Sequence, residues 1–420
     1  MKNHAFVLVT LSIIILMSTS GYSTPTNTQT LISGETTSLS LLRSEHYLYL
    51  TVLTSTEETT IDVAFPAEYG FQQPMLLEIH DDTTPHLATY AIIDDIHHPP
   101  NKLVRFTLVN LAKHTRILLH FSFWVLTQHH DYSDMPKEVA FPTPNQLPDD
   151  TLIWLQETDV VQTNHILIQR KARQLQGFSD NMISYIQRVA PFIKYHRYFL
   201  FLIQLNQGIF FNQDAVTTLL INGENVGRSH LAAALLRTKN IPARVLLAHN
   251  DQGFWTQMHY MLEYYVPDYG WVLLDSTKGQ TPYETQRQII NRICYPSDEN
   301  DTKKDYIIPF MRGEERWMWY DSTSIQPYYV DCDSGSKSKM FIEHTFKLNS
   351  SETTSLLQIT QQWFSTYEHY FDSHTSETST ESLITATEYI LQGFEHIKQA
   401  DLQEYEWVVL CALTEISNTQ

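Results

Sequence analysis

The sequence predicts an α+β protein with a mixed central region between two outer regions. Short β-rich runs fill residues 36–130, and a helix followed by strands fills the centre of the chain. Strand-forming residues return after residue 281, and amphipathic helical patterns occupy residues 350–417. The predicted fold class is therefore α+β.

Length and charge limit the possible functions. The chain has 420 residues, which suggests several domains, and 42% of them are hydrophobic, which is enough for well-formed cores. The formal net charge is −19, so nucleic acid and anionic membrane surfaces are excluded as expected partners. An acidic surface is also typical of a soluble exported protein.

Residues 1–23 have the pattern of a signal peptide. Lys2 supplies a positive charge, residues 5–17 form an apolar run, and residues 18–23 offer small side chains for cleavage. The run is short for a membrane span, and no second stretch of spanning length follows it. The sequence therefore predicts a secreted or extracytoplasmic protein with no stable membrane anchor in the mature chain.

Residues 36–130 are predicted to form a β-sandwich domain. Six β-rich runs occur there at short intervals, separated by clusters of Pro, Asp and Thr. Histidines next to acids, such as His80, His97 and His129, lack the spacing of a metal site and are interpreted as loop residues. No metal and no cofactor is predicted.

The central region, residues 150–280, carries the most specific pattern. Helical periodicity extends over 151–220, and a turn at 222–227 leads into an Ala- and Leu-rich helix that ends before Pro242. Three strand-forming segments follow, at 243–247, 260–266 and 271–274.

Five short motifs follow one another in this region. They are Gly223-Glu224-Asn225, Leu235-Leu236-Arg237, Ile241-Pro242-Ala243-Arg244, His259-Tyr260-Met261-Leu262-Glu263 and Gly270-Trp271-Val272-Leu273-Leu274-Asp275-Ser276-Thr277. In this order they resemble the transglutaminase-like superfamily, whose pattern is Gly-x-Cys, a helix ending in Leu-Leu-Arg, Gly-Ile-Pro-Ala-Arg, His-x-Trp-x-Glu and Gly-Trp-Val-x-x-Asp-x-Thr. The resemblance implies a papain-like core with a Cys-His-Asp triad. It places His259 on the histidine and Asp275 on the aspartate that fixes the imidazole tautomer.

The chain departs from this family at the nucleophile, because Asn225 occupies the position of the cysteine. A shift of the alignment by one residue offers only Glu224 or Val226. The three cysteines, Cys294, Cys332 and Cys411, all follow the helix, so no thiol is expected at the site.

Neighbouring residues have structural interpretations. Asn225 is expected to cap the helix, since Asn is a preferred N-cap residue. Ser229, one turn further along, is expected to be a small packing residue and not a substitute nucleophile. Met261 stands where the family has Trp, and Trp255 precedes His259 in a loop where it lines a groove or packs, with packing favoured.

Two regions follow the central one. Residues 281–348 are predicted to be a small β-rich region, where Trp317 and Trp319 face one side of a strand. Packing is favoured for this pair over a carbohydrate platform. Residues 350–417 are predicted to form a helical hairpin.

Two functions are compatible with these patterns. The favoured one is a secreted, catalytically inactive relative of the transglutaminase-like enzymes that binds a peptide or protein or is a structural extracellular module. The alternative is an active, cysteine-independent amide hydrolase, peptidase or acyltransferase that uses His259 and Asp275. The sequence alone leaves open whether the protein is an enzyme.

Overall fold

A computed structural model describes most of the chain from Thr36 onward, and these residues belong to one compact unit. The structure describes residues 36–417 except 53, 198, 201–202, 204–211, 251–256, 301, 303–310, 314–316, 319–334 and 374–376. The predicted signal peptide, Trp255, Trp319 and Cys332 lie outside the described residues. No helix among those described is both long and apolar enough to cross a bilayer.

Two antiparallel sheets contain the β-rich runs of the N-terminal region. The strands are β1 (Thr36–Val52), β2 (Thr56–Phe65), β3 (Gln72–Ile79), β4 (Leu87–Asp94), β5 (Lys102–Leu111), β6 (Arg116–Gln128), β11 (Met311–Gly313), β12 (Trp317–Met318) and β13 (Gly335–Asn349). One sheet has the order β12-β1-β6-β3 with β13 also on β1, and the other has the order β11-β2-β5-β4. Buried side chains of both sheets belong to one hydrophobic cluster. The predicted β-sandwich and its domain boundaries stay predictions.

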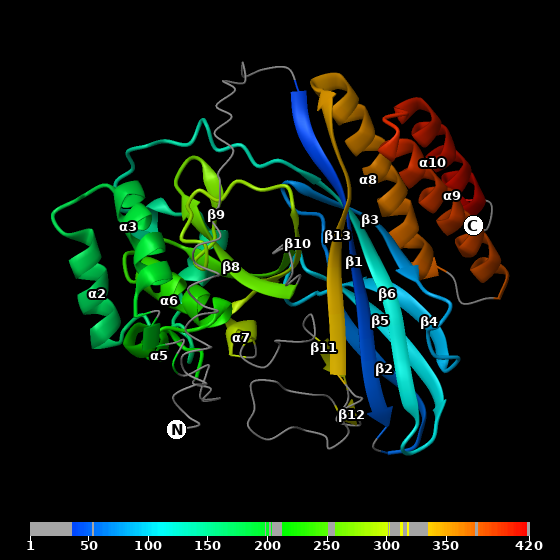
Figure 1. The fold of residues 1–420 in the computed structure, drawn as a ribbon, viewed down its shortest axis with the longest axis horizontal. Helices are drawn as coiled ribbons and strands as arrows, with labels where there is room; N and C mark the ends of the chain where they lie inside the picture. Colours follow the sequence, from blue (N-terminus) through cyan, green and yellow to red (C-terminus); the bar gives the residue numbers. More distant parts are fainter. Residues whose placement is uncertain are drawn as a thin grey trace, which may run out of the picture. The chain divides into compact units, whose positions relative to one another are not determined.

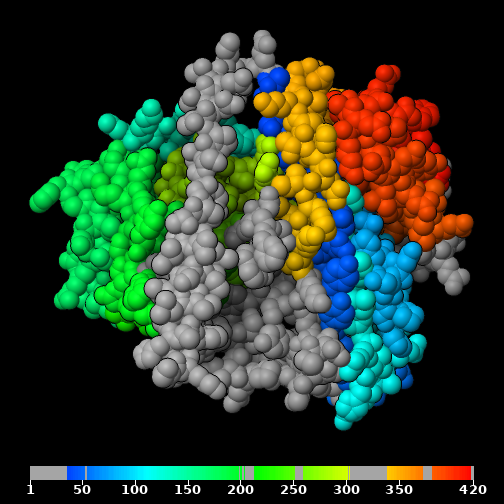
Figure 2. Space-filling view, viewed as in Figure 1, coloured from blue at the N-terminus to red at the C-terminus, as the bar shows by residue number. Residues whose placement is uncertain are grey.

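Strands from residues 281–348 extend these sheets. β13 runs antiparallel along β1, from the pair Thr36 and Asn349 to the pair Tyr49 and Gly335. The two strands lie side by side in Figure 1, and in Figure 2 the gold β13 follows the dark blue β1. The pattern of a strand indicates which of its faces is buried but not which strand it pairs with, so the sequence did not reveal this pairing.

Three helices follow β13. They are α8 (Ser350–Ser373), α9 (Glu377–Lys398) and α10 (Leu402–Ser417). The α8 helix lies against β3, where Trp363 Nε1 donates to Met75 O at 2.7 Å and Tyr367 OH donates to Leu77 O at 3.0 Å. These helices share the hydrophobic cluster of the two outer sheets. The C-terminal helical region therefore covers part of the N-terminal β structure.

The central region combines helices with a third sheet. Its helices are α2 (Ile166–Gln176), α3 (Met182–Tyr195), α5 (Ala215–Ile221), α6 (Asn225–Arg237) and α7 (Pro296–Glu299), preceded by the 3-10 turns η1 (Pro144–Gln146) and η2 (Asp149–Leu155). The sheet has the order β10-β7-β8-β9, with β7 (Ala243–Asn250), β8 (Gln257–Val266), β9 (Gly270–Leu274) and β10 (Gln288–Cys294). Together with the outer regions, this confirms the predicted α+β class.

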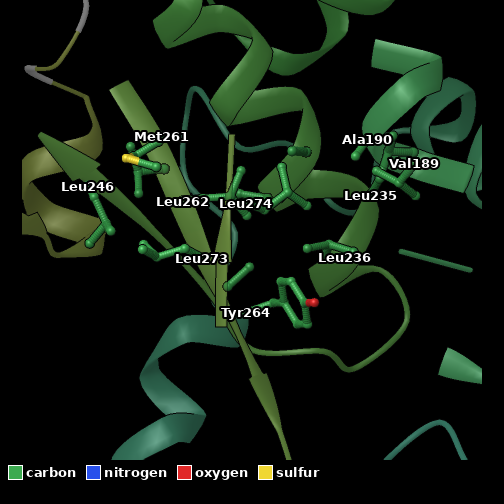
Figure 3. Close-up of a cluster of buried hydrophobic side chains, with 14 of the residues drawn as sticks. Val189, Ala190, Leu235, Leu236, Leu246, Met261, Leu262, Tyr264, Leu273 and Leu274 are labelled. Carbon is green, nitrogen blue, oxygen red and sulfur yellow. The ribbon is translucent and has the colours of Figure 1, made fainter. Parts of the chain in front are cut away.

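The α6 helix lies at the centre of this region. Every residue of α6 from Val226 to Arg237 is buried, which explains why Ala and Leu fill it with no polar stripe. Figure 3 shows Leu235 and Leu236 of α6 in a cluster with Val189 of α3 and with leucines of β7, β8 and β9. Because neighbours surround α6, a substitution that changes side-chain volume in this helix is expected to disturb the packing around it.

Two side-chain amides join the central sheet to the outer sheets. Gln72 donates from Nε2 to Ile290 O at 2.8 Å and accepts at Oε1 from Ile290 N at 2.7 Å. Asn101 makes the same pair of bonds with Ile293, both at 2.8 Å. Each side-chain amide bonds the N–H and C=O of one β10 residue, as a neighbouring strand would do. The backbone of Ile290 and Ile293 is therefore paired although the central sheet has no described strand on that side of β10.

Candidate active site

A tight turn determines where α6 begins. Asn222 has φ 88°, in the left-handed region, and its Oδ1 accepts from Gly223 N at 2.7 Å. At Gly227, a Cβ would lie 2.6 Å from Thr218 Oγ1 and 2.7 Å from Gln213 Oε1, so any larger residue would force these side chains to shift. The first turn of α6 is therefore held closely against α5 and the segment before it.

Asn225 is the first residue of α6 and not its cap. The N-cap is Glu224, with φ −72° and ψ −172°, and its side chain makes no capping hydrogen bond. The prediction that Asn225 caps the helix is therefore wrong, because an N-cap residue needs the extended backbone that Glu224 has. Asn225 Oδ1 is buried and has no hydrogen-bond partner in the described part of the chain.

The backbone at the start of α6 is also open. Among the described residues, no acceptor is found for the N–H groups of Asn225, Val226 or Gly227, whereas Arg228 N already donates to Glu224 O at 2.9 Å. Free N–H groups at a helix start carry partial positive charge. They can donate hydrogen bonds to a carbonyl oxygen or an anionic oxygen of a ligand.

His259 and Asp275 form a buried pair. His259 Nε2 lies 3.2 Å from Asp275 Oδ2, and the side chains are 1% and 0% exposed. The carboxylate can only accept, so the proton of this bond lies on Nε2. The structure thus brings together two of the three predicted site residues in the geometry of an oriented base.

Further contacts keep Asp275 ionised. Its Oδ1 accepts from the backbone N–H groups of Thr277 and Lys278, both at 2.9 Å. Burial by itself would raise the pKa of the Asp275 carboxyl. The charge and hydrogen bond of His259, helped by Lys278, outweigh burial and hold this pKa below its ordinary value.

Ser229 connects α6 to this pair. Its hydroxyl donates to Tyr260 O at 3.1 Å and lies 3.2 Å from Ser276 Oγ, and Tyr260 and Ser276 directly follow His259 and Asp275. Ser229 is fully buried and its one proton is used, which agrees with a packing role. Asn225 lies one turn before Ser229, about 6 Å along the helix axis. The N-terminal turn of α6 is therefore adjacent to β8, which carries His259, and to the segment after β9, which carries Asp275.

Other motif residues form a brace that involves the N-terminal region. Arg244 Nε donates to Glu263 Oε2 at 2.8 Å, and its guanidinium lies 3.9 Å from the centre of the Trp271 ring. Tyr69 accepts from Arg244 at 2.6 Å and donates to Glu263. Burial and the neighbouring carboxylate raise the pKa of Tyr69 well above its ordinary value. Sequence reasoning missed Tyr69, because no local pattern identifies the partner of a motif residue so far along the chain.

His230 is structural. Its Nδ1 donates to Gln213 O at 2.5 Å, and its Nε2 lies 2.9 Å from Thr302 Oγ1. Complete burial lowers the pKa of His230, which favours the neutral ring. It therefore fixes α6 to the segments before and after it without taking part in a charged site.

The cysteines that the structure describes belong to other elements. Cys294 is buried in β10, opposite Val245 of β7, and Cys411 is a partly buried free thiol on α10. No group of three His, Cys, Asp or Glu residues within the described part of the chain is arranged to hold a metal ion.

Comparison with known families agrees with this geometry. A family model described as the transglutaminase-like superfamily matches residues 171–276, which include α6, His259 and Asp275. Residues 171–276 are a transglutaminase-like domain. A search of curated proteins gave no match.

Three solved structures are similar to the chain. A proposed cysteine protease from Cytophaga hutchinsonii has a TM-score of 0.47 and 16% identity, and the match covers 73% of this chain and 100% of that protein. The periplasmic domain of TgpA from Pseudomonas aeruginosa, bound to ethylmercury, has a TM-score of 0.26 and 14% identity, over 58% of this chain and 91% of that domain. A proposed protease from Parabacteroides distasonis has a TM-score of 0.20 and 14% identity, over 56% of this chain and 63% of that protein.

Within the transglutaminase-like domain, the hydrogen bond from His259 to Asp275 orients the imidazole ring. The assignment of Asn225 to the nucleophile position stays a prediction from the motif spacing.

Proposed function

We propose that the transglutaminase-like domain has lost the covalent chemistry of its relatives and binds an extended peptide or protein segment. The observation that carries this proposal is Asn225 at the first position of α6, where the motif spacing puts the nucleophile. A carboxamide nitrogen is not basic, and a carboxamide forms no stable acyl intermediate, so Asn225 cannot replace a thiolate.

The remaining polar groups support binding over catalysis. Ser229, the nearest hydroxyl on the same side of α6, is buried and donates its proton to Tyr260 O. The N–H groups at the start of α6, which have no acceptor within the described residues, suit a ligand carbonyl. A cysteine-independent hydrolase that uses His259 and Asp275 is therefore the less favoured function.

We also propose that the protein is exported. The support is the pattern of residues 1–23, with Lys2, an apolar run and small residues in the order of a signal peptide. Fractionation of cells that express the full chain, with sequencing of the mature N-terminus, tests this point. A mature protein that starts at Met1 inside the cell would overturn it.

The test of lost chemistry compares three proteins on a panel of fluorogenic peptide amides and esters. We expect no turnover by the unmodified protein and measurable turnover by Asn225→Cys. The double variant Asn225→Cys/His259→Ala should lose that turnover, because the thiol no longer has its base. Turnover by the unmodified protein that disappears in His259→Ala would instead establish the hydrolase function.

Thiol reactivity tests the geometry without any substrate. A cysteine at a helix start beside a histidine has a lowered pKa. We expect the thiol of Asn225→Cys to be alkylated by iodoacetamide at pH 6.5 at least about tenfold faster than that of Glu224→Cys. Mass spectrometry of the peptide that contains the new cysteine measures both rates, and the control moves the thiol by one residue only. Equal rates would contradict the assigned register.

Binding is tested by titrating the unmodified protein with the capped peptide acetyl-tetraalanine-N-methylamide in a calorimeter or by NMR. Saturable binding is expected. If it is absent, the peptide-binding function is wrong, and a structural role between the flanking regions is the remaining one.

A further inference from the structure

Two buried amide side chains share the face of the central sheet that carries His259. Asn250, the last residue of β7, lies opposite Gln288, the first residue of β10. On the other side of β7, Ala248 lies opposite His259 of β8. Because residues two apart on a strand, and residues opposite one another, point to the same face, Asn250, Gln288 and His259 share one face. Asn250 and His259 are diagonal neighbours, which are about 7–8 Å apart in an antiparallel sheet.

Both amides are buried, and neither has a hydrogen-bond partner among the residues that the structure describes. Asn250 is 1% exposed and Gln288 is 0% exposed. The nitrogen and the oxygen of each side chain all lack a partner, although the two residues lie directly opposite one another. Buried polar groups are nearly always paired in native proteins, so four unpaired atoms at one place need an explanation.

Other buried amides that contact the same strand are paired. Gln72 makes two bonds to Ile290 of β10 and a third to Ala67 O at 2.9 Å. Asn101 makes two bonds to Ile293 of β10. Gln72 and Asn101 are thus paired along β10, whereas the nitrogen and the oxygen of both Asn250 and Gln288 lack partners among the described residues.

The chemistry of these groups indicates the class of ligand. Each carboxamide offers an N–H donor and a C=O acceptor and carries no charge. The charged pair on this face, Arg244 and Glu263, is closed by its own bonds with Tyr69. An uncharged group with one donor and one acceptor matches the available atoms, and a backbone peptide group is such a group.

We propose that Asn250 and Gln288 form an amide-binding subsite beside His259 that takes the N–H and C=O of a backbone peptide group in an uncharged, extended ligand. This subsite rests on the proposed peptide-binding function and specifies which residues hold the ligand backbone. Paired with the ligand, both side chains gain the hydrogen bonds that they lack in the free protein.

The first test needs no ligand. Asn250→Leu and Gln288→Met replace each amide with an apolar side chain of similar shape, which removes unpaired groups from the free protein. We expect the melting temperature to stay the same or rise by a few degrees. The matched controls Asn101→Leu and Gln72→Met break existing bonds and should lower the melting temperature clearly. Asn250→Leu and Gln288→Met proteins that melt as low as these controls would show that the amides are satisfied in the free protein and would overturn the subsite.

The second test uses acetyl-tetraalanine-N-methylamide as the probe. Side-chain amide NMR signals of Asn250 and Gln288 are assigned by their loss in the two variants, and we expect both signals to shift saturably with the peptide. Affinity should fall by about tenfold or more in Asn250→Leu and Gln288→Met. An analogue of the peptide with its central amides replaced by esters lacks the N–H donors. It should bind the unmodified protein more weakly than the peptide does, whereas the two variants should bind the peptide and the analogue equally.

The outcomes separate the two proposals. Peptide binding that both variants retain would overturn the subsite and leave the peptide-binding function in place. Turnover by the unmodified protein would show that the domain is catalytically active. It would not change the melting temperatures or the peptide affinities by which the subsite is tested.

Discussion

The α6 helix and the β7 strand each have one end whose polar side chains are fully paired and one end whose polar side chains are not. At the C-terminal end of α6, Arg237 donates to Ala243 O at 2.9 Å, to Gln156 O at 2.8 Å and to both oxygens of Glu299. At the start of β7, Arg244 is paired with Glu263 and Tyr69. The unpaired polar groups lie at the other end of each element, at the start of α6 and at the end of β7.

At those opposite ends the pairing stops. Among the described residues, Asn225 Oδ1 at the start of α6 has no partner, and neither do the ring nitrogens of His249 or the amide nitrogen and oxygen of Asn250 at the end of β7. Ala248, next to them, lies opposite His259. The unpaired ends are therefore the ends nearest to the candidate site. The paired ends hold the fold, whereas at the start of α6 and on the face of β7 that carries Asn250 a ligand would complete the hydrogen bonding.

Removing Arg237 should have the largest effect on stability. Arg237 and Glu299 are both 0% exposed, so Arg237→Met leaves a buried carboxylate without its counter-charge. The expected loss is about 3–5 kcal/mol in the free energy of unfolding. Urea denaturation followed by circular dichroism measures this loss.

Two further variants sharpen that measurement. Arg170→Met removes an exposed arginine and should change the free energy of unfolding by less than about 0.5 kcal/mol. Arg237→Met/Glu299→Leu removes both charges and should recover part of the loss. If the single variant is as stable as the unmodified protein, the paired end of α6 does not hold the fold.

Low pH should reduce the free energy of unfolding because of His249, near the end of β7. Complete burial lowers the pKa of His249 to about 3, and burial with the nearby His249 ring, whose centre lies 5.6 Å away, also lowers the pKa of His46. A histidine in the unfolded chain takes up a proton near pH 6.5, whereas folded His249 does not until about pH 3. Stability is thus lost as the pH falls from about 6.5 toward 3, by about 2 kcal/mol at pH 5 for this one group.

The variant His249→Leu isolates this effect. Its free energy of unfolding should decrease less between pH 7 and pH 5 than that of the unmodified protein, because the group that the folded state cannot protonate is gone. Urea denaturation across this pH range provides the comparison. A difference between the two proteins that does not depend on pH would show that His249 does not resist protonation in the folded state.

The sequence predicted the parts of the fold that are encoded locally. The Ala- and Leu-rich run of α6 and the strands around His259 and Trp271 follow from propensity and from motifs, and the structure has them where expected. The pairing of β13 with β1 could not be predicted in this way. Strand partners are chosen by tertiary packing, and a single strand pattern carries no information about them.

The candidate site was predicted in part. Motif spacing identified His259 and Asp275, which the structure shows bonded to each other. The cap at Asn225 was wrong by one residue, an error typical of helix ends, where the chain changes from extended to helical backbone. Asn250 and Gln288 were not identified. A polar residue at the end of the apolar run of β7 was a possible signal, but only a structure shows that its side chain is buried and unpaired.

The smallest expected effect concerns Asn225 itself. Asn225→Ala removes a buried oxygen that has no partner and places a better helix former inside the first turn of α6. The free energy of unfolding should change by less than about 0.5 kcal/mol, or increase. Asn181→Ala is the matched control, since Asn181 caps α3 by accepting from Ile183 N at 2.9 Å, and its removal should cost about 1 kcal/mol. A comparable loss at both positions would show that Asn225 has a structural role after all. If only Asn181→Ala is destabilising, the unpaired start of α6 does not contribute to the stability of the fold, and the asparagine there is free to serve a ligand.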